Sequence, residues 1–457
     1  MTTTTEAAGA VAAGAAAGAQ PAGSADEAAA APRPTRPPLP PVADPAEPLA
    51  LEAARELVAA GALRAGPVGA VGLELERHVV DVAAPQRRVP WDRLRGALRG
   101  VRTPSGSAVT LEPGGQVELS SPPAAHVAGA VAALREDAAV LDAALAGEGL
   151  VLLSVGADPS RPPERVNPGA RYAAMEAYFR RAGHGADGAL MMCSTASLQV
   201  NVEAGPAAGW AERLASLARL RAVLVALGAC SPYVAGGPTG LRSSRAAMWC
   251  RLDPGRCAGP ASGGLAAGSA DPAQAWAGFA LEAPVMLVRG AGDAVAPALE
   301  AATMAEWVTG ARPLAGRRPT ADDLELHLST LWPPVRLRGF LELRLLDAVP
   351  ADLWPGLAAL VVAALDDPAA ADGAAHAAEP VADLVGEAAR DGLSDRRLRR
   401  AAAGVVAAAL PAVPDALRPD VERWAALVDA GRTPADLVTE RARRDGHAAC
   451  LLAEELR

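Results

Sequence analysis

Four short stretches of this chain alternate between apolar and polar side chains, which is the pattern of β-strands that bury one face. These stretches are 71–80, 116–120, 198–203 and 340–346. Successive side chains of a strand point to opposite faces, so residues two apart share a side. The pattern therefore predicts a sheet with one apolar face and one polar face.

The polar positions of the four strands have an unusual composition. A polar strand face usually meets water and carries Thr, Ser, Lys and Arg, and that reading stays open for any single strand. If the strands are neighbours, their carboxylates converge, and like charges oppose joint ionisation unless a cation intervenes. Carboxylate and amide oxygens favour Mg²⁺, Mn²⁺ or Ca²⁺ over Zn²⁺. The polar positions are Glu74, Glu76, Gln116, Glu118, Gln199, Asn201, Glu342 and Arg344.

Two other segments fit a phosphate site. The segment Glu112-Pro-Gly-Gly-Gln116 predicts a tight turn, in which two glycines would let backbone N–H groups approach an anion. The segment 240–245 contains Arg245 and is followed by Trp249, Arg251 and Arg256, whose guanidinium groups suit phosphate or carboxylate; a solvated arginine-rich loop is the alternative. His78 continues the alternation of the first strand, but a lone histidine at a strand end is more often a surface or supporting residue than a ligand.

The composition excludes several kinds of site. All 43 basic residues are arginine, which excludes a Walker-type phosphate loop, a Schiff base and a lysine-anchored pyridoxal site. The net charge of −9 and the lack of a basic stripe argue against nucleic acid as a partner. The 5 cysteines show no zinc spacing, and we expect reduced thiols.

The organisation along the chain predicts an α+β fold. Residues 1–48 are rich in Ala, Gly and Pro and predict a disordered tail, followed by one catalytic domain over 49–457. Helices are expected at 127–146 and 210–227, and nearly everything after Asp352 reads as helix. Prolines and glycines break the uncharged stretch 222–241, so we expect no membrane span. The N-terminus lacks the features of a secretory signal, which favours the cytoplasm.

Five segments of this chain, which occur in the same order as in the family, resemble the glutamate-cysteine ligase family of the plant and actinobacterial kind. That family lies within the glutamine-synthetase-like carboxylate-amine ligases. The Glu-Pro-Gly-Gly-Gln-x-Glu-Leu-Ser block and the Glu-x-Arg block are the specific ones. Relatives often have aspartate where this chain has Glu203, and plant relatives have a lysine before the Arg-Tyr pair, where this chain has Gly169-Ala170. The segments are 72–76, 112–120, 170–175, 195–201 and 327–347.

The resemblance implies a curved antiparallel sheet with helices on one face and, on its concave face, magnesium-bound ATP and glutamate. By the resemblance, the metal shell would be Glu74, Glu76, Glu112, Glu118, Gln199 and Glu342. Asn201 and Arg344 would touch the phosphates or the transferred group, and Arg245 is a further phosphate candidate. Arg171 and Tyr172 would lie near the glutamate.

The implied reaction joins the γ-carboxyl of glutamate to the amine of cysteine, and the similarity is greatest to actinobacterial ligases that supply γ-glutamylcysteine for ergothioneine. ATP would convert the unreactive carboxylate to an acyl phosphate, which the amine attacks. No residue in the sequence stands out as a general base. Two alternatives stay open: a ligase that uses another amine, and a catalytically inactive relative that senses glutamate or nucleotide.

Overall fold

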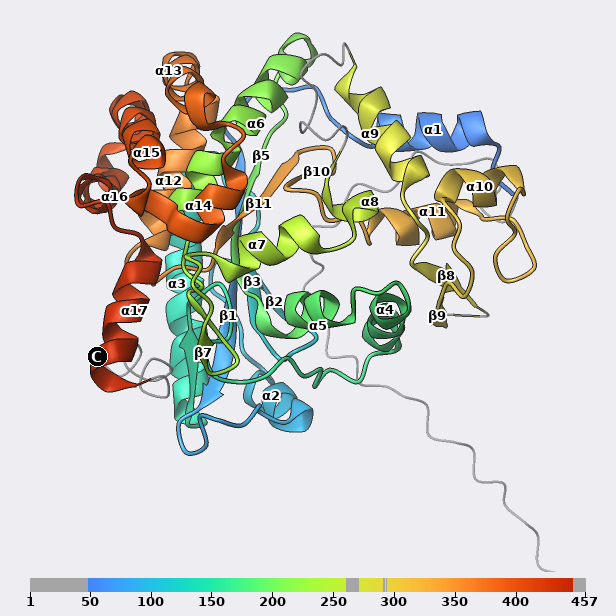
Figure 1. Cartoon of the computed structure of the whole chain (residues 1–457), viewed down its shortest axis with the longest axis horizontal. Coiled ribbons are helices and arrows are strands. Elements are labelled where there is room, and N and C mark those ends of the chain that lie inside the picture. Colours follow the sequence, from blue (N-terminus) through green and yellow to red (C-terminus); the bar gives the residue numbers. More distant parts are fainter. Residues whose placement is uncertain (1–47, 260–270, 291, 293, 447–457) are drawn as a thin grey trace, which may run out of the picture.

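The computed structural model describes residues 48–259, 271–290, 292 and 294–446 (Figure 1). The predicted tail therefore lies outside the described residues, apart from Pro48. Among the described residues, no helix is long and apolar enough to cross a membrane. An antiparallel sheet and a large helical layer make up an α+β fold, as the sequence predicted.

The central sheet has 7 strands, of which six run in the order β10-β11-β5-β1-β3-β2, while β4 pairs with β1. All of these pairings are antiparallel. The four predicted strands correspond to β1, β3, β5 and β11, and they are consecutive neighbours in the sheet. The strands are β1 (Val71–Asp81), β2 (Ala108–Leu111), β3 (Val117–Ser120), β4 (Leu150–Leu153), β5 (Ser197–Val202), β10 (Val335–Leu337) and β11 (Leu341–Asp347).

The register of the strands brings the polar side chains together. Glu76 lies opposite Glu118 across β1 and β3, and Glu74 lies opposite Gln199 across β1 and β5. On the other side of β5, Asn201 lies opposite Glu342. A shift between Leu343 and Leu346 interrupts the pairing of β11 with β5 just after these residues. Three separate strand pairings thus place the predicted polar side chains on one continuous face.

The opposite face of the sheet is apolar and buried, as the alternation predicted. Leu73, Leu119, Leu198 and Val200 have no exposed surface. Burying them accounts for much of the stability of the sheet, at roughly 1.5–3 kcal/mol for each large side chain. The helices that contact this sheet from the apolar side are α3 (Val127–Gly147), α6 (Trp210–Leu227) and α12 (Trp354–Asp366), close to the positions predicted for the first two.

The remaining elements form a helical C-terminal layer and a second group of helices beside the polar face (Figure 1). The helices of the C-terminal layer are α13 (Pro368–Ala378), α14 (Val385–Asp391), α15 (Arg396–Ala409), α16 (Arg418–Asp429) and α17 (Pro434–Asp445). The other elements are α1 (Leu51–Ala60), α2 (Trp91–Ala97), α4 (Ala170–Arg181), α5 (Gly185–Ser194), α7 (Ser244–Arg251), α8 (Pro254–Cys257), α9 (Pro272–Glu282), α10 (Met304–Thr309) and α11 (Ala321–Leu328), with the small hairpins β6 (Tyr233–Val234) and β7 (Gly237–Pro238), and β8 (Leu287–Arg289) and β9 (Val295–Pro297).

The predicted turn before β3 is present, but its glycines have another role than the one expected. The Gly115 N–H donates to the carbonyl oxygen of Glu112 (3.0 Å), and Gly115 has a φ of 84°. A Cβ on Gly114 would lie 2.1 Å from the carbonyl oxygen of Cys193. Both glycines thus serve close packing against neighbouring protein atoms, and the expectation that they admit a phosphate is wrong.

Replacing Gly114 tests this packing role. In Gly114→Ala, the new Cβ would collide with backbone of α5, which is not free to move aside, so the turn must shift. We expect a loss of about 1–3 kcal/mol in the free energy of unfolding, measured by urea denaturation. Gly96→Ala, in α2 with no atom within 4 Å of the place where a Cβ would lie, is the control and should be neutral or stabilising. Equal stability of the two variants would contradict the packing role.

Candidate active site

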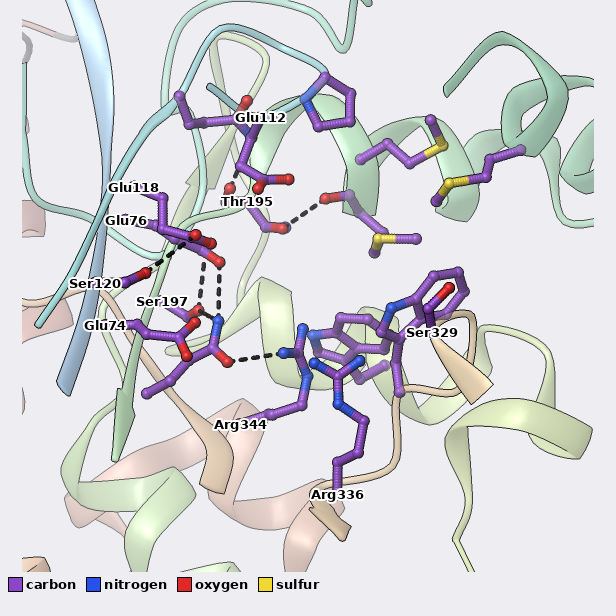
Figure 2. Close-up of a pocket in the computed structure, with 18 of the residues that line it drawn as sticks. Glu74, Glu76, Glu112, Glu118, Ser120, Thr195, Ser197, Ser329, Arg336 and Arg344 are labelled. Carbon is purple, nitrogen blue, oxygen red and sulfur yellow. Dashed lines mark hydrogen bonds between the residues drawn. The ribbon is translucent and has the colours of Figure 1, made fainter. Parts of the chain in front are cut away.

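A cavity of about 460 Å³ lies over the polar face of the sheet. The sheet side of the cavity holds carboxylates and arginines, and Figure 2 shows them facing one another. The opposite side comes from α4, α5, α7, α9, α11 and the segment after α11. The lining residues are Glu74, Glu76, Glu112, Pro113, Gln116, Glu118, Ser120, Arg171, Tyr172, Met175, Met191, Met192, Thr195, Ser197, Gln199, Arg245, Trp249, Trp276, Glu325, Leu328, Ser329, Trp332, Arg336, Leu337, Arg338 and Arg344.

Glu74 and Glu76, two residues apart on β1, are strongly influenced by their surroundings. Burial raises the pKa of Glu74 to about 8, and the charges of Glu118 and Glu342 add to the shift. Burial and the charge of Glu118 also raise the pKa of Glu76. Burial is the larger cause and repulsion between neighbouring carboxylates adds to it, so ionising these groups carries an electrostatic cost that a cation would relieve.

Neighbouring strands supply hydrogen bonds that fix the orientation of these carboxylates. Asn201 Nδ2 donates to Glu74 Oε1 (3.0 Å), and Gln199 Nε2 donates to Glu76 Oε1 (3.0 Å). On β2, the Thr110 hydroxyl donates to Glu118 Oε1 (2.9 Å). Each carboxylate is therefore held in place by a polar side chain from an adjacent strand, before any ligand binds.

Arginines occupy the other half of the polar face. Arg336 Nη2 and Arg338 Nη1 donate to Glu342 Oε1 at 2.9 and 2.8 Å, and Arg336 Nε donates to Glu342 Oε2. Arg344 Nη1 lies farther from that carboxylate, at 3.5 Å, and donates to Gln199 Oε1 at 2.7 Å. Burial opposes ionisation of Glu342, yet the three arginines hold its pKa well below the usual range.

Arg245 reaches the cavity from α7 through a buried polar network. Its Nη2 donates to the backbone carbonyl of Arg344 (2.9 Å), and its Nη1 lies 3.7 Å from Asp347 Oδ1. Asp347 also accepts hydrogen bonds from the hydroxyls of Ser231 (2.7 Å) and Ser243 (3.0 Å). Ser243 caps α7, so Asp347 ties the end of β11 to the helix that carries Arg245.

The far side of the cavity combines apolar and charged groups. Arg171 and Tyr172, at the start of α4, line it, and Arg171 Nη2 donates to Ser329 Oγ (2.9 Å). Figure 2 shows Ser329 across the cavity from Glu74. The apolar lining consists of Met175, Met191, Met192, Trp249, Trp276, Leu328 and Trp332. This wall can exclude water from a bound substrate.

The structure brings together most residues that the sequence singled out. Nine of the eleven predicted site residues line the cavity. Asn201 and Glu342 are not among the lining residues, but they contact residues that are: Asn201 donates to Glu74, and Glu342 accepts from Arg336. Asn201 was expected to touch the phosphates, and in the structure its side chain donates to Glu74 instead of lining the cavity. Of the arginine-rich segment, Arg251 pairs with Asp187 and Arg256 is fully buried, and neither lines the cavity. His78 is also fully buried, so it is not a surface residue.

Sequence reasoning missed Arg336 and Arg338 as site residues. They flank Leu337 in β10, a strand of three residues, and alternate with it in the way that Glu342 and Arg344 alternate with Leu343. The alternation Arg-Leu-Arg was the available signal. It is too short to predict a strand without knowledge of its pairing with β11.

The carboxylate side chains are chemically suited to a magnesium ion. Within the described residues, no group of three or more His, Cys, Asp or Glu side chains is already arranged to hold a metal. Magnesium usually keeps several waters and binds one or two carboxylates together with substrate phosphates, so it does not need such a group. Burial and the neighbouring carboxylates raise the pKa of Glu74 and of Glu76, and a cation at this place would favour their ionised forms.

The fold and the cavity define a class of protein: one in which carboxylates and arginines line a single cavity over the polar face of an antiparallel sheet. Residues 70–453 match the sequence profile of glutamate-cysteine ligase family 2. The chain therefore belongs to the glutamate-cysteine ligase family, and it is a ligase of that family.

Individual relatives support this assignment. The chain is 46% identical over 401 residues to the glutamate-cysteine ligase EgtA of Mycolicibacterium smegmatis, covering 88% of this chain and 93% of that protein. It is 29% identical over 281 residues to the chloroplastic glutamate-cysteine ligase of Medicago truncatula, covering 60% and 53%. The solved structure of a bifunctional glutathione synthetase from Pasteurella multocida shares the fold, with a TM-score of 0.52, 14% identity, and 85% and 52% of the two chains covered.

The raised pKa of Glu74 predicts how the stability of the metal-free protein depends on pH. A carboxyl whose pKa rises from 4.5 to about 8 on folding stabilises the folded state most below pH 4.5, and this contribution is lost as the pH rises through 8. Glu74→Gln removes the titration. We expect its free energy of unfolding to exceed that of the parent protein by about 2–4 kcal/mol at pH 8 and to match it near pH 4.5. Denaturation in chelator at both pH values measures this, and parallel pH profiles would contradict it.

The contacts of Glu342 predict that Arg336 matters more for stability than Arg344. Arg336→Met removes two hydrogen bonds from a fully buried carboxylate, whereas Arg344→Met leaves the contacts from Arg336 and Arg338 in place. We expect Arg336→Met to cost about 3–5 kcal/mol of stability and Arg344→Met clearly less. Thermal melting compares them. A larger loss in Arg344→Met would show that Glu342 depends on another partner than the structure indicates.

Proposed function

We propose that this protein catalyses the ATP-dependent ligation of the glutamate γ-carboxyl to the amine of cysteine, giving γ-glutamylcysteine, ADP and phosphate. The observation that carries the proposal is the division of one cavity into a carboxylate half and an arginine half. A nucleoside triphosphate with its cation needs the carboxylate half, and the anionic group that is transferred needs the arginine half. Family membership and the EgtA relatives support the choice of glutamate and cysteine.

The arginines of this chain would bind and orient the reacting groups. Transfer of a phosphoryl group requires positioning and neutralisation of charge rather than covalent help from the protein. Arg344 and Arg336 line the cavity beside the carboxylates, where they would hold the γ-phosphoryl group against the glutamate carboxylate. Arg245, held by Asp347, is a further phosphate contact. The apolar wall would keep water away from the acyl phosphate until the amine attacks.

Magnesium would be held by Glu74, Glu76 and Glu118, with Glu112 at the edge of the same half of the cavity. Gln199 was expected in this shell, but its only side-chain oxygen accepts a hydrogen bond from Arg344 (2.7 Å), so a cation on Gln199 would have to displace that guanidinium group. When bound, magnesium neutralises phosphate charge and helps align the nucleotide. Glu342 was also expected in this shell, but its oxygens accept hydrogen bonds from Arg336 and Arg338, so a cation on Glu342 would have to displace a guanidinium group. We assign Glu342 and Asn201 the positioning of their neighbours.

Three finer assignments complete the proposal. The relatives from Mycolicibacterium smegmatis and Mycobacterium tuberculosis carry the name EgtA, and the product is proposed to serve ergothioneine or related thiol biosynthesis. A cytoplasmic location suits this role, because ATP and free cysteine are available there. Arg171 and Tyr172 are proposed to bind the glutamate, since both line the cavity opposite the carboxylates.

An ADP-release assay tests the function. With ATP, magnesium and glutamate, we expect cysteine to give the highest kcat/KM among a panel of amino acids and amino-sugars, and excess chelator to lower the rate at least about 100-fold, because the clustered carboxylates would repel phosphates without a cation. Preference for another amine would support the alternative that the protein is a ligase for that amine. Tight binding of glutamate or nucleotide with no ADP released under any condition would support the alternative that the protein is a catalytically inactive sensor.

A further inference from the structure

Among the acidic residues that line the cavity, Glu325 is the one that comes from a helix. Glu325 lies on α11 and lines the cavity together with Ser329. Residues four apart on a helix lie one above the other on the same face, so the Glu325 side chain projects beside Ser329. Arg171 reaches Ser329 from α4 by a hydrogen bond of 2.9 Å. An acidic and a basic side chain, Glu325 and Arg171, therefore line the same wall of the cavity on either side of Ser329.

We propose that Glu325 and Arg171 together recognise the amino-acid end of glutamate, Glu325 by its α-ammonium and Arg171 by its α-carboxylate. A zwitterionic amino acid carries these two charges on substituents of one carbon, and adjacent side chains of opposite sign match them. This inference deepens the proposed function and rests on it, since it concerns how the same cavity selects its substrate.

Glu325 and Arg171 lie where the α-groups of glutamate would have to be if its γ-carboxyl points toward the arginines of the sheet. Ser329 lies across the cavity from Glu74, with Arg336 and Arg344 between them in the view of Figure 2. A glutamate bound by its α-groups near Ser329 would extend its γ-carboxyl toward these arginines. The amine of cysteine must stay free to attack, so an acidic side chain that binds ammonium suits the spectator amine of glutamate.

A simpler role for Glu325 would be to hold Arg171 in position. In that case, its loss would weaken the binding of any substrate carboxylate that Arg171 contacts, whether or not the substrate carries an amino group. Glutarate distinguishes the two roles, because it keeps both carboxylates of glutamate and lacks only the α-ammonium. Direct recognition of the ammonium affects glutamate alone.

The experiment compares Glu325→Gln with the parent protein by the KM for glutamate and the inhibition constant of glutarate, both in the ADP-release assay with cysteine. We expect KM for glutamate to rise at least about 10-fold while the inhibition constant of glutarate stays within about twofold, on the scale of losing a charged hydrogen-bonding partner. Arg171→Gln should weaken both ligands. Asp322→Asn, an exposed residue of the same helix outside the cavity, is the matched control and should change neither.

The outcomes separate failure of this inference from failure of the proposed function. If the parent protein releases no ADP with glutamate and cysteine, the proposed function fails. If it is active and Glu325→Gln weakens glutamate and glutarate equally, Glu325 only positions Arg171 and the inference is overturned. An unchanged KM for glutamate, or a change confined to the KM for cysteine, also overturns it. Glu325→Ala serves as a second variant, and equal melting temperatures verify that both variants are folded.

Discussion

Repulsion among carboxylates on one face of the sheet is the constraint on which the rest of the site depends. Antiparallel pairing of β1 with β3 sets Glu76 directly opposite Glu118, an arrangement that costs stability in the absence of a partner charge. The apolar side chains on the reverse of the same strands offset this cost, because slipping the register by one residue would turn leucines toward the cavity and glutamates into the core. The hydrophobic layer thus enforces an unfavourable electrostatic arrangement that a cation and its ligand can use.

Glu342 organises the opposite charge. It binds Arg336 and Arg338 through hydrogen bonds, and this keeps two guanidinium groups at the β10 and β11 end of the cavity rather than on the acidic side chains of β1 and β3. The raised pKa of Glu74 is consistent with this separation, since a direct arginine contact would have lowered it. Without the buried carboxylate of Glu342, the two halves of the cavity could neutralise each other and leave neither available for substrate.

The sequence allowed prediction of the sheet face but not of its surroundings. Alternation within four strands is a local pattern, and it assigned Glu74, Glu118, Gln199 and Arg344 to the polar face of their strands. That they line one cavity depends on the order of the strands in the sheet, which the alternation does not give. The role of Gly114 depends on the carbonyl of Cys193, which is distant in sequence, so a turn motif alone could not reveal it. The same holds for Arg256, whose burial against Asp253, Tyr178 and Thr330 depends on packing between helices and loops.

Local sequence patterns predicted fewest of the residues in the wall of the cavity opposite the sheet. Its residues come from several helices and connecting segments, each contributing one or two side chains with no shared periodicity. Phosphoryl transfer imposes a fixed arrangement of charge on the sheet, whereas recognition of a particular amino acid needs only a few groups at the correct distance from it. The strand pattern could therefore indicate a site for a cation and phosphates, whereas the wall opposite it depends on tertiary contacts such as that between Arg171 and Ser329.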